Sequence, residues 1–517
     1  MPSTTPTEVL IVGAGPTGLV LALWLARLGV QVRIIDKTTE PGTTSRALAV
    51  QARTLEFYRQ IGLADDVVAR GREVPAARLW VAGRQVARAV FGDMGAGISP
   101  YPYACIFPQD EHERLLIDRL REAGVMVERE TELVGFDQRS DRIVARLARA
   151  DGHLATCEAA FAAGCDGAHS RIRETLSIGF GGGTYEHVFY VADVEARGPA
   201  MNGDINVAFD LADFLAVFPL RGPNRARLVG VLRNGAEAVR SRGNLTWDDV
   251  GRRVIGWLQL DVERVNWFST YRVHHRVADR FRSGRAFLAG DAAHVHSPVG
   301  GQGMNTGIGD AVNLAWKLAA VLRRRADDRV LDTYEPERIA FARRLVSTTD
   351  QAFTAVTSSS ATARAVRLHL VPRVLPPLFT LRSFRRLAFR TVSQTAITYR
   401  GSQLSEGHAG RVQGGDRLPW VPVDSGRDSD NFAPLRSLEW QVHVYGEAAP
   451  GVADLCAQRH LALHAFAWRR EMERAGLQRG ALYLVRPDGH VALAVPDQSR
   501  AALSAYLTAH GIYLRPA

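Results

Sequence analysis

Short apolar runs alternate with glycines and polar residues near the start of the chain, in the order strand, turn, helix, strand. Val9–Val12 is an apolar run that predicts a buried parallel strand. Residues 19–28 form an apolar stretch of helical length, and residues 30–35 predict a second strand. Further along, residues 205–209 and 214–220 are strand-like runs. The pattern therefore predicts an α/β fold that begins with a βαβ unit.

The turn between the first strand and the helix has the spacing G-x-G-x-x-G, with glycines at Gly13, Gly15 and Gly18. The first glycine permits a tight turn, the second lets the backbone approach a pyrophosphate, and the third lets helix and strand pack closely. Pro16 suits the first turn of a helix. Asp36 ends the second strand, where a carboxylate can accept hydrogen bonds from both adenosine ribose hydroxyls. The alternative is a glycine-rich turn without a ligand, but the whole unit favours a bound dinucleotide.

A downstream segment decides between NAD and FAD. Residues 285–291 predict a strand that runs into a loop and ends in the carboxylate of Asp291. Such a carboxylate can bind a ribityl hydroxyl, which NAD lacks. The loop 297–303 contains three glycines, so a flat ring can lie against bare backbone there. A helix then begins near Asn305, and its N-terminal dipole would stabilise an anionic reduced flavin. The sequence therefore predicts FAD.

These segments resemble the para-hydroxybenzoate hydroxylase family, the single-component class A flavoprotein aromatic monooxygenases. A third motif, Cys165–Arg173, carries the Asp-Gly pair that in this family contacts FAD and is tied to NAD(P)H use. Ser45–Ala47 resembles the segment whose arginine reaches FAD and substrate, and Pro108–Gln109 resembles the segment whose glutamine contacts the flavin. The resemblance covers residues 8–350 with specific motifs and the remainder more weakly. It is closest to the longer branch, which acts on phenols, phenylpropionates and aromatic polyketides.

The motifs and the resemblance together predict a set of cofactor contacts: Gly13, Gly15, Pro16, Thr17, Gly18, Asp36, Lys37, Arg46, Gln109, Val134, Asp166, Gly167, Gly290, Asp291, Pro298, Gly300, Gly301, Gly303, Met304 and Asn305.

Three of the residues near the flavin loop are candidates for catalysis. The family uses the backbone carbonyl at the position of Pro298 near the substrate phenol, and the arginine at the position of Arg46 reaches the same region. His296, like the neighbouring His294, is a candidate for assisting deprotonation of a substrate phenol, although a histidine there can equally satisfy backbone groups. The chain departs from the family in small ways: Asp36 replaces Glu, Ser297 replaces Pro and Met304 replaces Leu.

The mechanism that the resemblance implies has two halves. NADH or NADPH reduces FAD, and the reduced flavin traps O₂ as a C4a-hydroperoxide whose distal oxygen passes to an electron-rich aromatic carbon. Only one G-x-G-x-x-G is present, so NAD(P)H acts as a transient reductant without a Rossmann domain of its own. The resemblance therefore implies hydroxylation of a phenolic or polycyclic aromatic, polyketide-like small molecule.

Three other interpretations stay open at this point. The same scaffold serves Baeyer–Villiger or epoxidising monooxygenases, and a related flavoprotein fold serves reductases or dehydrogenases that consume no O₂. A protein of another class, a non-catalytic FAD-binding or regulatory protein, is the third. The intact acidic residues and glycine loop argue against that last interpretation, and oxidation of NAD(P)H would test it.

The expected fold is α/β, with a Rossmann-like FAD-binding domain interleaved with an antiparallel-sheet substrate domain. The FAD domain is expected in two pieces, residues 1–180 and 270–350, interrupted by the substrate-binding sheet at 181–269. Residues 351–400 are expected to form a helical connection. Residues 401–517 resemble the thioredoxin-like tail of longer family members, without the redox C-x-x-C.

Two local patterns in residues 401–517 predict secondary structure. Residues 481–492 predict a β-hairpin whose turn is Pro487–Gly489, and residues 499–510 predict a final helix. We expect a structural or dimer-contact role for this part, so a homodimer is left open.

The net charge of +10 comes almost entirely from arginine, because lysine occurs only at positions 37 and 317. The arginines are scattered rather than clustered with aromatic residues, which argues against nucleic-acid binding. The densest groups, 323–325 and 382–390, are interpreted as solvated helix faces, and a basic surface can steer anionic NAD(P)H.

Cysteine usage and the apolar pattern indicate the compartment. The four cysteines show no metal-ligand spacing and no C-x-x-C pair, so no metal is predicted and free thiols in a reducing cytoplasm are expected. The polar residues 1–8 do not resemble a signal peptide, and no apolar stretch is long enough for a membrane span.

Overall fold

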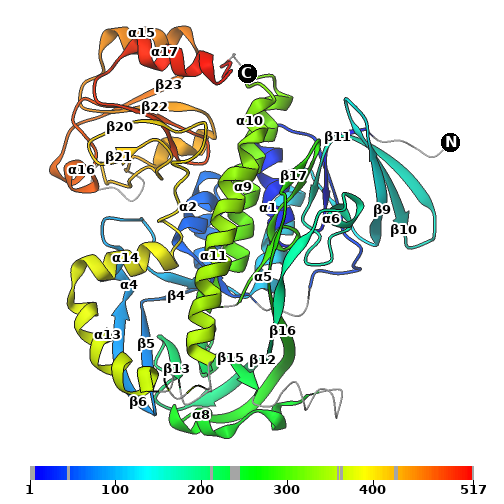
Figure 1. The fold of residues 1–517 in the computed structure, drawn as a ribbon, viewed down its shortest axis with the longest axis vertical. Coiled ribbons are helices and arrows are strands. Elements are labelled where there is room, and N and C mark those ends of the chain that lie inside the picture. The colour runs from blue at the N-terminus through cyan, green and yellow to red at the C-terminus, as the bar shows by residue number, and fades with distance from the viewer. Residues whose placement is uncertain are drawn as a thin grey trace.

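The chain forms two eight-stranded sheets, a six-stranded sheet and a small three-stranded sheet, which helices connect and cover (Figure 1). The computed structural model describes residues 6–42, 47–209, 214–232, 245–297, 299–357, 360, 362, 365–423 and 429–514. In this part of the chain, no helix has both the length and the apolar character needed to cross a bilayer.

The first eight-stranded sheet contains the predicted βαβ unit. Its strands are β1 (Thr7–Val12), β2 (Val32–Ile35), β8 (Val127–Glu128), β9 (Thr131–Gln138), β10 (Ile143–Arg149), β11 (Leu154–Gly164), β17 (Arg282–Ser283) and β18 (Ala286–Leu288). β1 pairs in parallel with β2 on one side and with β11 on the other, and β18 continues the sheet in parallel beside β11. The predicted unit is confirmed, with the second strand beginning at Val32.

Helix α1 (Pro16–Arg27) lies at the centre of this domain. Its residues 18–25 are all buried, because α1 packs between α5 (Gln109–Glu122) and α9 (Gly303–Leu322). A helix that is apolar on every side is stable only when it is surrounded. The other helices of this part are α2 (Ala52–Gln60), α3 (Ala64–Arg70), α4 (Phe91–Gly95), α6 (Arg171–Thr175), α10 (Arg329–Asp332) and α11 (Tyr334–Thr357).

The second eight-stranded sheet is larger than the predicted insert. It runs in the order β19 (His294–Val295), β16 (Asp261–Ala278), β12 (Phe180–Arg197), β15 (Arg225–Leu232), β14 (Phe214–Pro219), β13 (Ile205–Phe209), β5 (Ala76–Val81) and β6 (Arg84–Val90). Strands β5 and β6 come from outside residues 181–269, and β13 pairs with β5 in parallel rather than antiparallel. The hairpin β5–β6 covers the edge that β13 would otherwise leave open.

The two faces of this second sheet have different surroundings. One face carries Tyr190, Leu215 and Leu228, which pack with the residues around α8 (Arg252–Trp257) and the short helix Trp247–Asp249. The opposite face, which we call the inner face, carries Val191, Ala216 and Val229. It adjoins the three-stranded sheet of β3 (Ala49–Val50), β4 (Arg72–Val74) and β7 (Ala104–Ile106), because one apolar cluster joins them. The inner face is therefore turned toward the first domain.

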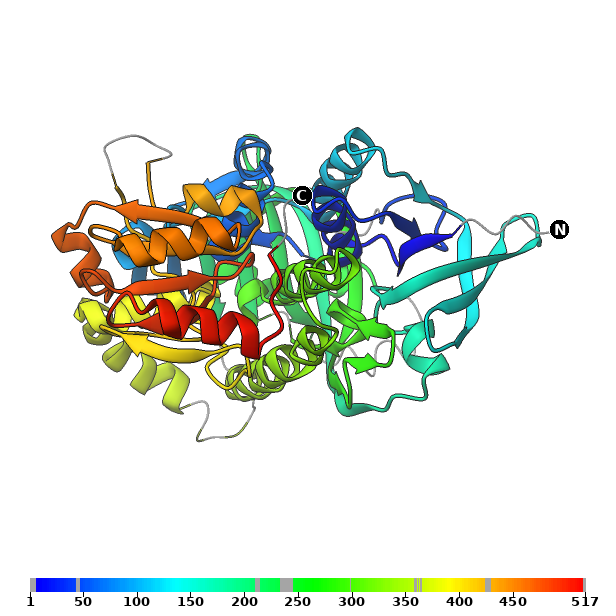
Figure 2. The same cartoon turned by 90° about the horizontal axis from the view of Figure 1, so that it is seen from above.

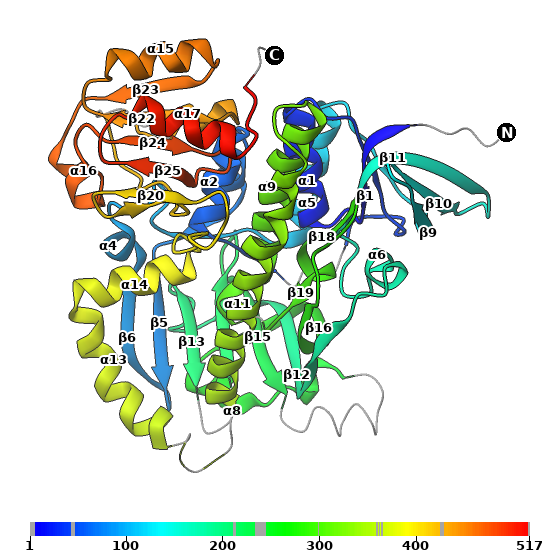
Figure 3. The ribbon, with the colours of Figure 1, turned by 45° about the horizontal axis from the view of Figure 1, so that its top comes forward.

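A helical connection follows α11. A π-helical turn, Val366–Leu370, leads into α13 (Val371–Thr380) and α14 (Arg382–Val392). α13 contacts β6 and α14 contacts α4, so both helices lie at the outer edge of the second sheet (Figure 3).

The C-terminal part forms the six-stranded sheet, at the opposite end of the molecule from β9 and β10 (Figures 1 and 2). Its elements are β20 (Glu406–Ala409), β21 (Val412–Gln413), β22 (Gln441–Tyr445), β23 (Ala462–Phe466), β24 (Leu482–Val485), β25 (Val491–Val495), α15 (Pro450–Gln458), α16 (Arg470–Ala475) and α17 (Arg500–Ala509). β24 and β25 confirm the predicted hairpin, and α17 confirms the predicted final helix. The thioredoxin-like assignment stays a prediction.

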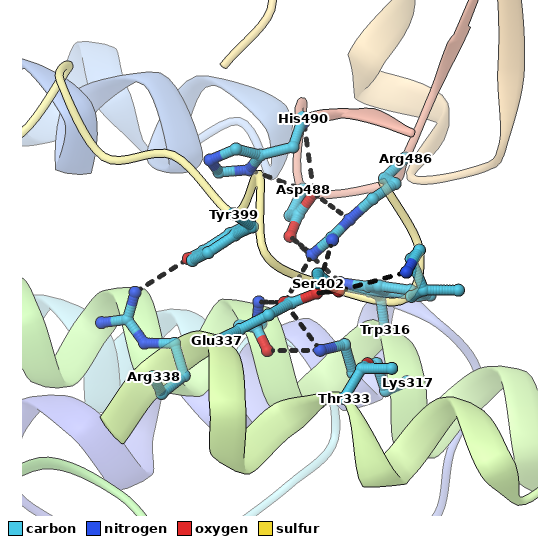
Figure 4. A network of polar contacts seen from close by, with 12 residues as sticks. Trp316, Lys317, Thr333, Glu337, Arg338, Tyr399, Ser402, Arg486, Asp488 and His490 are labelled. Carbon is cyan, nitrogen blue, oxygen red and sulfur yellow. Dashed lines mark hydrogen bonds and ion pairs between the residues drawn. The ribbon is translucent and has the colours of Figure 1, made fainter. Parts of the chain in front are cut away.

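Buried ion pairs fix this C-terminal sheet against α9 and α11 (Figure 4). Arg486, at the end of β24, donates to both carboxylate oxygens of Glu337 on α11 at 2.8 and 3.0 Å, and to Asp488 in the hairpin turn at 2.6 Å. Lys317 on α9 lies 2.8 Å from the same Glu337 carboxylate. All four side chains are at most 2% exposed. Although desolvation alone raises it, Arg486 and Lys317 hold the pKa of Glu337 below its usual value.

Helix α2 carries a second set of buried charges toward the same sheet. Glu56 pairs with Arg417 at 2.8 Å and with Arg53 at 2.9 Å, and Arg59 pairs with Asp430 at 2.7 Å. Every residue of α2 is buried, so these charges are satisfied by one another rather than by water.

Removing one charge from the first set should be costly. We expect Arg486→Met to lower the free energy of unfolding by about 3–5 kcal/mol, because the buried carboxylates of Glu337 and Asp488 lose their shared cation. Chemical denaturation followed by tryptophan fluorescence measures this loss. The control is Arg329→Ala, which breaks only a surface pair with Asp327 and should leave the unfolding midpoint unchanged. Equal midpoints for the two variants would contradict the assignment.

A buried histidine makes the free energy of unfolding depend on pH in a range above that in which carboxylates titrate. Burial lowers the pKa of His443 on β22 to about 3, from about 6.5 for an ordinary histidine. Between these values the unfolded chain binds a proton that the folded chain does not, so stability falls as the pH drops below about 6.5. We expect His443→Gln to reduce the slope of unfolding free energy against pH by about 1.4 kcal/mol per unit between pH 6 and pH 4. An unchanged slope would show that His443 is protonated in the folded protein.

A candidate flavin-binding site

The three positions of the first turn require glycine for different structural reasons. A Cβ at Gly13 would collide with the carbonyl oxygen of Cys165, and Gly13 has a φ of +104° that disfavours other residues. A Cβ at Gly18 would collide with the carbonyl oxygen of Gly13. By contrast, a Cβ at Gly15 would meet no atom within 4 Å. Gly13 and Gly18 therefore serve packing, whereas Gly15 borders open space into which a ligand can fit.

The N-terminus of α1 opens beside Gly15. Gly15 is the N-cap residue, Pro16 occupies the first turn, and no side chain caps the helix. The hydroxyl of Thr17 lies against Gly290 and Gly307, because a Cβ at either position would collide with its Oγ1. An uncapped helix N-terminus with backbone N–H groups free of side chains suits a phosphate group.

Asp36, at the end of β2, helps to shape the glycine turn. One carboxylate oxygen accepts from the backbone N–H of Ala14 at 2.7 Å, and the other accepts from the backbone N–H and the hydroxyl of Thr38. The neighbouring Lys37 is exposed, and Val134 on β9 is 48% exposed. Contact of these three residues with the adenosine portion of FAD stays a prediction.

Asp166 lies directly beside the turn, where β11 ends. Its Oδ2 accepts from the backbone N–H of Arg171 at 2.7 Å. Its Oδ1 is buried and has no hydrogen-bond partner among the described residues, and desolvation raises the pKa of Asp166. A buried carboxylate oxygen without a partner is costly in a folded protein, so this atom indicates a ligand that donates to it. The following Gly167 has a φ of +78° and open space at its Cβ position.

Gly290 and Asp291 form a short turn after β18, and a buried carboxylate of α9 holds this turn. Asp310 accepts from the backbone N–H of Gly290 at 3.0 Å and lies 2.7 Å from Nε2 of His294. Its other oxygen accepts from Arg338 of α11 at 2.6 Å. Although burial alone raises it, the charge of Arg338 holds the pKa of Asp310 below its usual value. Asp291 itself is exposed at the outside of the turn.

The glycine loop before α9 is fixed by Asn305 and Gln51. The Asn305 side chain donates to the carbonyl oxygens of Ala49 and Gly301, and it accepts from the backbone N–H of Gln51 and the hydroxyl of Thr54. Asn305 therefore has no side-chain group left for a cofactor, and only its backbone can contact one. No side chain caps α9 in the described structure. Gly300 and Gly301 have φ values of +78° and +62°, and Gly303 and the half-buried Met304 begin α9.

His296 is held in one tautomer beside this loop. Its Nδ1 lies 2.8 Å from the carbonyl oxygen of Ser297, so Nδ1 carries the proton and Nε2 is an acceptor. Nε2 lies beside Gly303, is buried, and has no partner among the described residues. Burial, with His294 nearby, lowers the pKa of His296 to about 4, so the ring is neutral at pH 7.

Gln109 begins α5 and packs at the edge of the region. Its backbone N–H donates to the carbonyl oxygen of Ala47, and its side-chain amide donates to Glu113 at 2.8 Å. Arg46, Pro298 and residues 43–45 lie outside the described residues.

Four predicted segments thus converge where parallel strands end. The residues after β2, β1, β11 and β18 are Asp36, Gly13, Asp166 and Gly290, and backbone hydrogen bonds join neighbouring strand ends. Ligands of open parallel sheets bind at this edge. The open space at Gly15, the uncapped α1 and the unpartnered Asp166 oxygen all fit the pyrophosphate and hydroxyl groups of FAD.

Sequence analysis missed two residues of this arrangement, Asp310 and Arg338. The available signal was a carboxylate within the otherwise apolar α9, where burial without a partner would be prohibitive.

Comparisons with known proteins agree with this geometry. A family model described as an FAD binding domain matches residues 6–349. A flavin-dependent monooxygenase of Mycobacteroides abscessus is 33% identical over 504 residues, covering 93% of this chain and 96% of the relative. A 6-methylpretetramide 4-monooxygenase of Streptomyces rimosus is 35% identical over 541 residues, covering 98% and 94% of the two chains.

Among solved structures, the flavin-dependent monooxygenase PieE in complex with FAD and substrate has a TM-score of 0.80 and 24% identity, with both chains fully covered, which shows a shared fold. The resemblance found in the sequence is confirmed, and this chain belongs to the family of flavin-dependent monooxygenases built on this FAD-binding domain.

Proposed function

We propose that this flavin-dependent monooxygenase hydroxylates a phenolic or polycyclic aromatic, polyketide-like substrate, with NADPH or NADH as the transient reductant. The observation that carries the proposal is the unpartnered oxygen of Asp166, whose backbone adjoins Gly13, together with the open space at Gly15 and the uncapped α1, on a chain with full-length monooxygenase relatives. The 6-methylpretetramide 4-monooxygenase among those relatives supports the polyketide-like substrate class.

The residues that would hold FAD follow from the site. The backbone at Gly15 and α1 would meet the pyrophosphate, and Asp166 Oδ1 would accept from a donor of the cofactor. The chemistry supplied by bound FAD is acceptance of a hydride from NAD(P)H and activation of O₂ for transfer to an aromatic carbon. The uncapped N-terminus of α9 would stabilise negative charge that develops in front of it.

The inner face of the second sheet suits a flat aromatic substrate. Val191, Ala216 and Val229 are buried at its centre. Around them lie half-buried apolar side chains, four of them aromatic: Val207, Phe214, Phe218, Trp267 and Tyr271. Large aromatic side chains that remain half-exposed on an inward face line space for an apolar ligand.

His296 would orient a substrate hydroxyl. Its neutral ring presents Nε2 as an acceptor beside the glycine loop, and the Ser297 carbonyl fixes the tautomer. With a pKa of about 4, His296 is too weak a base to hold a phenolic proton at pH 7. Its proposed role is therefore to accept a hydrogen bond from the phenol, which raises electron density in the ring.

Gly15→Ala tests the cofactor site without disturbing the fold. A methyl group fits at residue 15, which has a φ of −77°, so the apoprotein should fold with a loss of stability of no more than about 1 kcal/mol, because alanine is a poorer N-cap residue than glycine. The same methyl group would occupy the space in which the pyrophosphate approaches, and we expect the affinity for FAD to fall at least about tenfold, or 1.4 kcal/mol. Isothermal titration of apoprotein with FAD measures this change.

The matched control is Gly451→Ala near the start of α15, where a Cβ also meets nothing within 4 Å. It should leave FAD affinity unchanged and raise stability by at most about 1 kcal/mol, because alanine is favoured over glycine in a helix. Wild-type FAD affinity in Gly15→Ala would place the cofactor elsewhere.

Rapid-mixing absorbance tests the reaction itself. NADPH or NADH is mixed anaerobically with the FAD-loaded protein, with and without members of a panel of phenols and polycyclic aromatics, and air is then admitted. We expect one aromatic compound to accelerate flavin reduction and to yield a product that is heavier by one oxygen atom and carries a new phenolic hydroxyl group, detected by mass spectrometry and NMR spectroscopy. Reduction that is followed by slow reoxidation without oxygenated product would support a reductase, and a lactone or epoxide would support the alternative oxygenations.

A further inference from the structure

The helical connection has an unusual charge pattern. Residues 351–405 contain eight arginines and neither aspartate nor glutamate. From the sequence, the arginines at 382–390 were interpreted as a solvated helix face. The structure shows that this face also exposes apolar side chains, which a solvated face does not require.

Most of the exposed large apolar side chains of the described chain gather on this connection. Ten such residues are more than two-fifths exposed, and six of them form what we call the α13–α14 patch: Val366, Leu370, Val374, Leu381, Leu387 and Val392. Their exposed fractions lie between 41% and 62%. So many exposed large apolar side chains on one short connection favour an interaction surface over ordinary surface composition.

The patch follows from how the two helices pack. Val366, Leu370 and Val374 are spaced four residues apart along a continuous helical segment, so they form one stripe. On the other side, Phe379 and Phe389 pack in the cluster beneath α4 and β6. None of the α13 residues is buried, whereas α14 buries only Phe389. The three residues of the stripe are exposed, so they take no part in that packing. Figure 3 shows α13 and α14 themselves at the edge of the molecule.

Arginines surround the apolar side chains. Arg373, Arg382 and Arg390 are exposed, and Arg385 and Arg386 are half-buried. Among the described residues, none of these five forms an ion pair with a carboxylate. Desolvation and the neighbouring arginines lower the pKa of Arg386, which reflects the crowding of like charge. Within residues 351–405 no carboxylate offsets these charges, and in the part of the chain that the structure describes only Arg390 of the five arginines interacts with one, Asp416. The excess of positive charge suits an anionic partner.

We propose that the α13–α14 patch docks the protein on the surface of an anionic lipid bilayer. The apolar side chains would enter the boundary between headgroups and acyl chains, and the arginines would contact lipid phosphates while their stems cover apolar surface. A second copy of the chain is a poor occupant, because a symmetric contact would bring the two sets of arginines together. A fluid bilayer also accepts a convex pair of helices without a matching groove. The docking neither requires nor excludes the proposed reaction.

Vesicle flotation of the FAD-loaded protein tests the docking. We expect binding to vesicles of phosphatidylcholine mixed with phosphatidylglycerol, weakened by salt, and little binding to phosphatidylcholine alone. The double variant Leu381→Gln/Leu387→Gln should reduce partitioning more than tenfold, because two apolar side chains are lost from the contact. Arg382→Gln and Arg390→Gln should each reduce it about fivefold.

The controls carry the same substitutions elsewhere on the surface. Leu154→Gln on β11 removes a leucine that is 65% exposed, and Arg114→Gln on α5 removes an exposed arginine. Both should bind vesicles as the wild type does, and all variants should retain FAD content and NAD(P)H oxidation. Absence of binding to anionic vesicles, or equal binding by the patch and control variants, would overturn the proposal. A solution dimer that dissociates in the patch variants would also overturn it, in favour of a second copy.

Discussion

The turn that presents Gly290 depends on one buried carboxylate, Asp310 of α9. This side chain is fully buried, yet it accepts from the backbone of Gly290, from His294 and from Arg338. A buried charge is tolerated only when each of its oxygens is satisfied. Asp310 holds the turn that follows β18, and the turn also satisfies Asp310, because movement of the turn would leave the buried carboxylate without one of its donors. A flexible glycine turn is thereby held in one position beside the first glycine motif.

The partner of Asp310 extends this constraint toward the C-terminal sheet. Arg338 also donates to the hydroxyl of Tyr399 at 2.8 Å, and the Tyr399 ring packs in a tilted arrangement against His490 with ring centroids 4.4 Å apart (Figure 4). The preceding residue of α11, Glu337, accepts a hydrogen bond from Arg486 of the same hairpin as His490. Two successive residues of α11 therefore have different partners: Arg338 pairs with Asp310, which holds the Gly290 turn, and Glu337 pairs with the C-terminal sheet. The C-terminal sheet is thus joined through its hairpin to Glu337, the neighbour of the arginine that pairs with Asp310 at the Gly290 turn.

The sequence predicted the elements that depend on local chemistry and missed those that depend on distant contacts. The glycine turn, α1 and the hairpin at Pro487–Gly489 follow from short patterns whose physical cause lies within a few residues. Strands β5 and β6 belong to the second sheet only because β13 pairs with β5 across a long separation in sequence, which no local pattern reveals. The predicted cofactor contact of Asn305 stays a prediction, and it is narrowed to the backbone because the side chain bonds Ala49, Gly301, Gln51 and Thr54. Hydrogen-bond satisfaction of this kind becomes visible only when the surrounding backbone is in place.

The separation of the two sheets also explains what the family can vary. The cofactor supplies the reactive chemistry, so the first sheet and its strand ends must keep a fixed geometry for the flavin. Under the proposed function, substrate selection is the task of the inner face of the second sheet, where side chains alternate in and out and can change without altering the backbone. The half-buried aromatic residues of that face, Phe214, Phe218, Trp267 and Tyr271, belong to an apolar cluster that is separate from the core of the first sheet. On that proposal, one fold can preserve its flavin site while its substrate changes, and these four residues, rather than the motifs that reveal the cofactor, are where the identity of the substrate is to be sought.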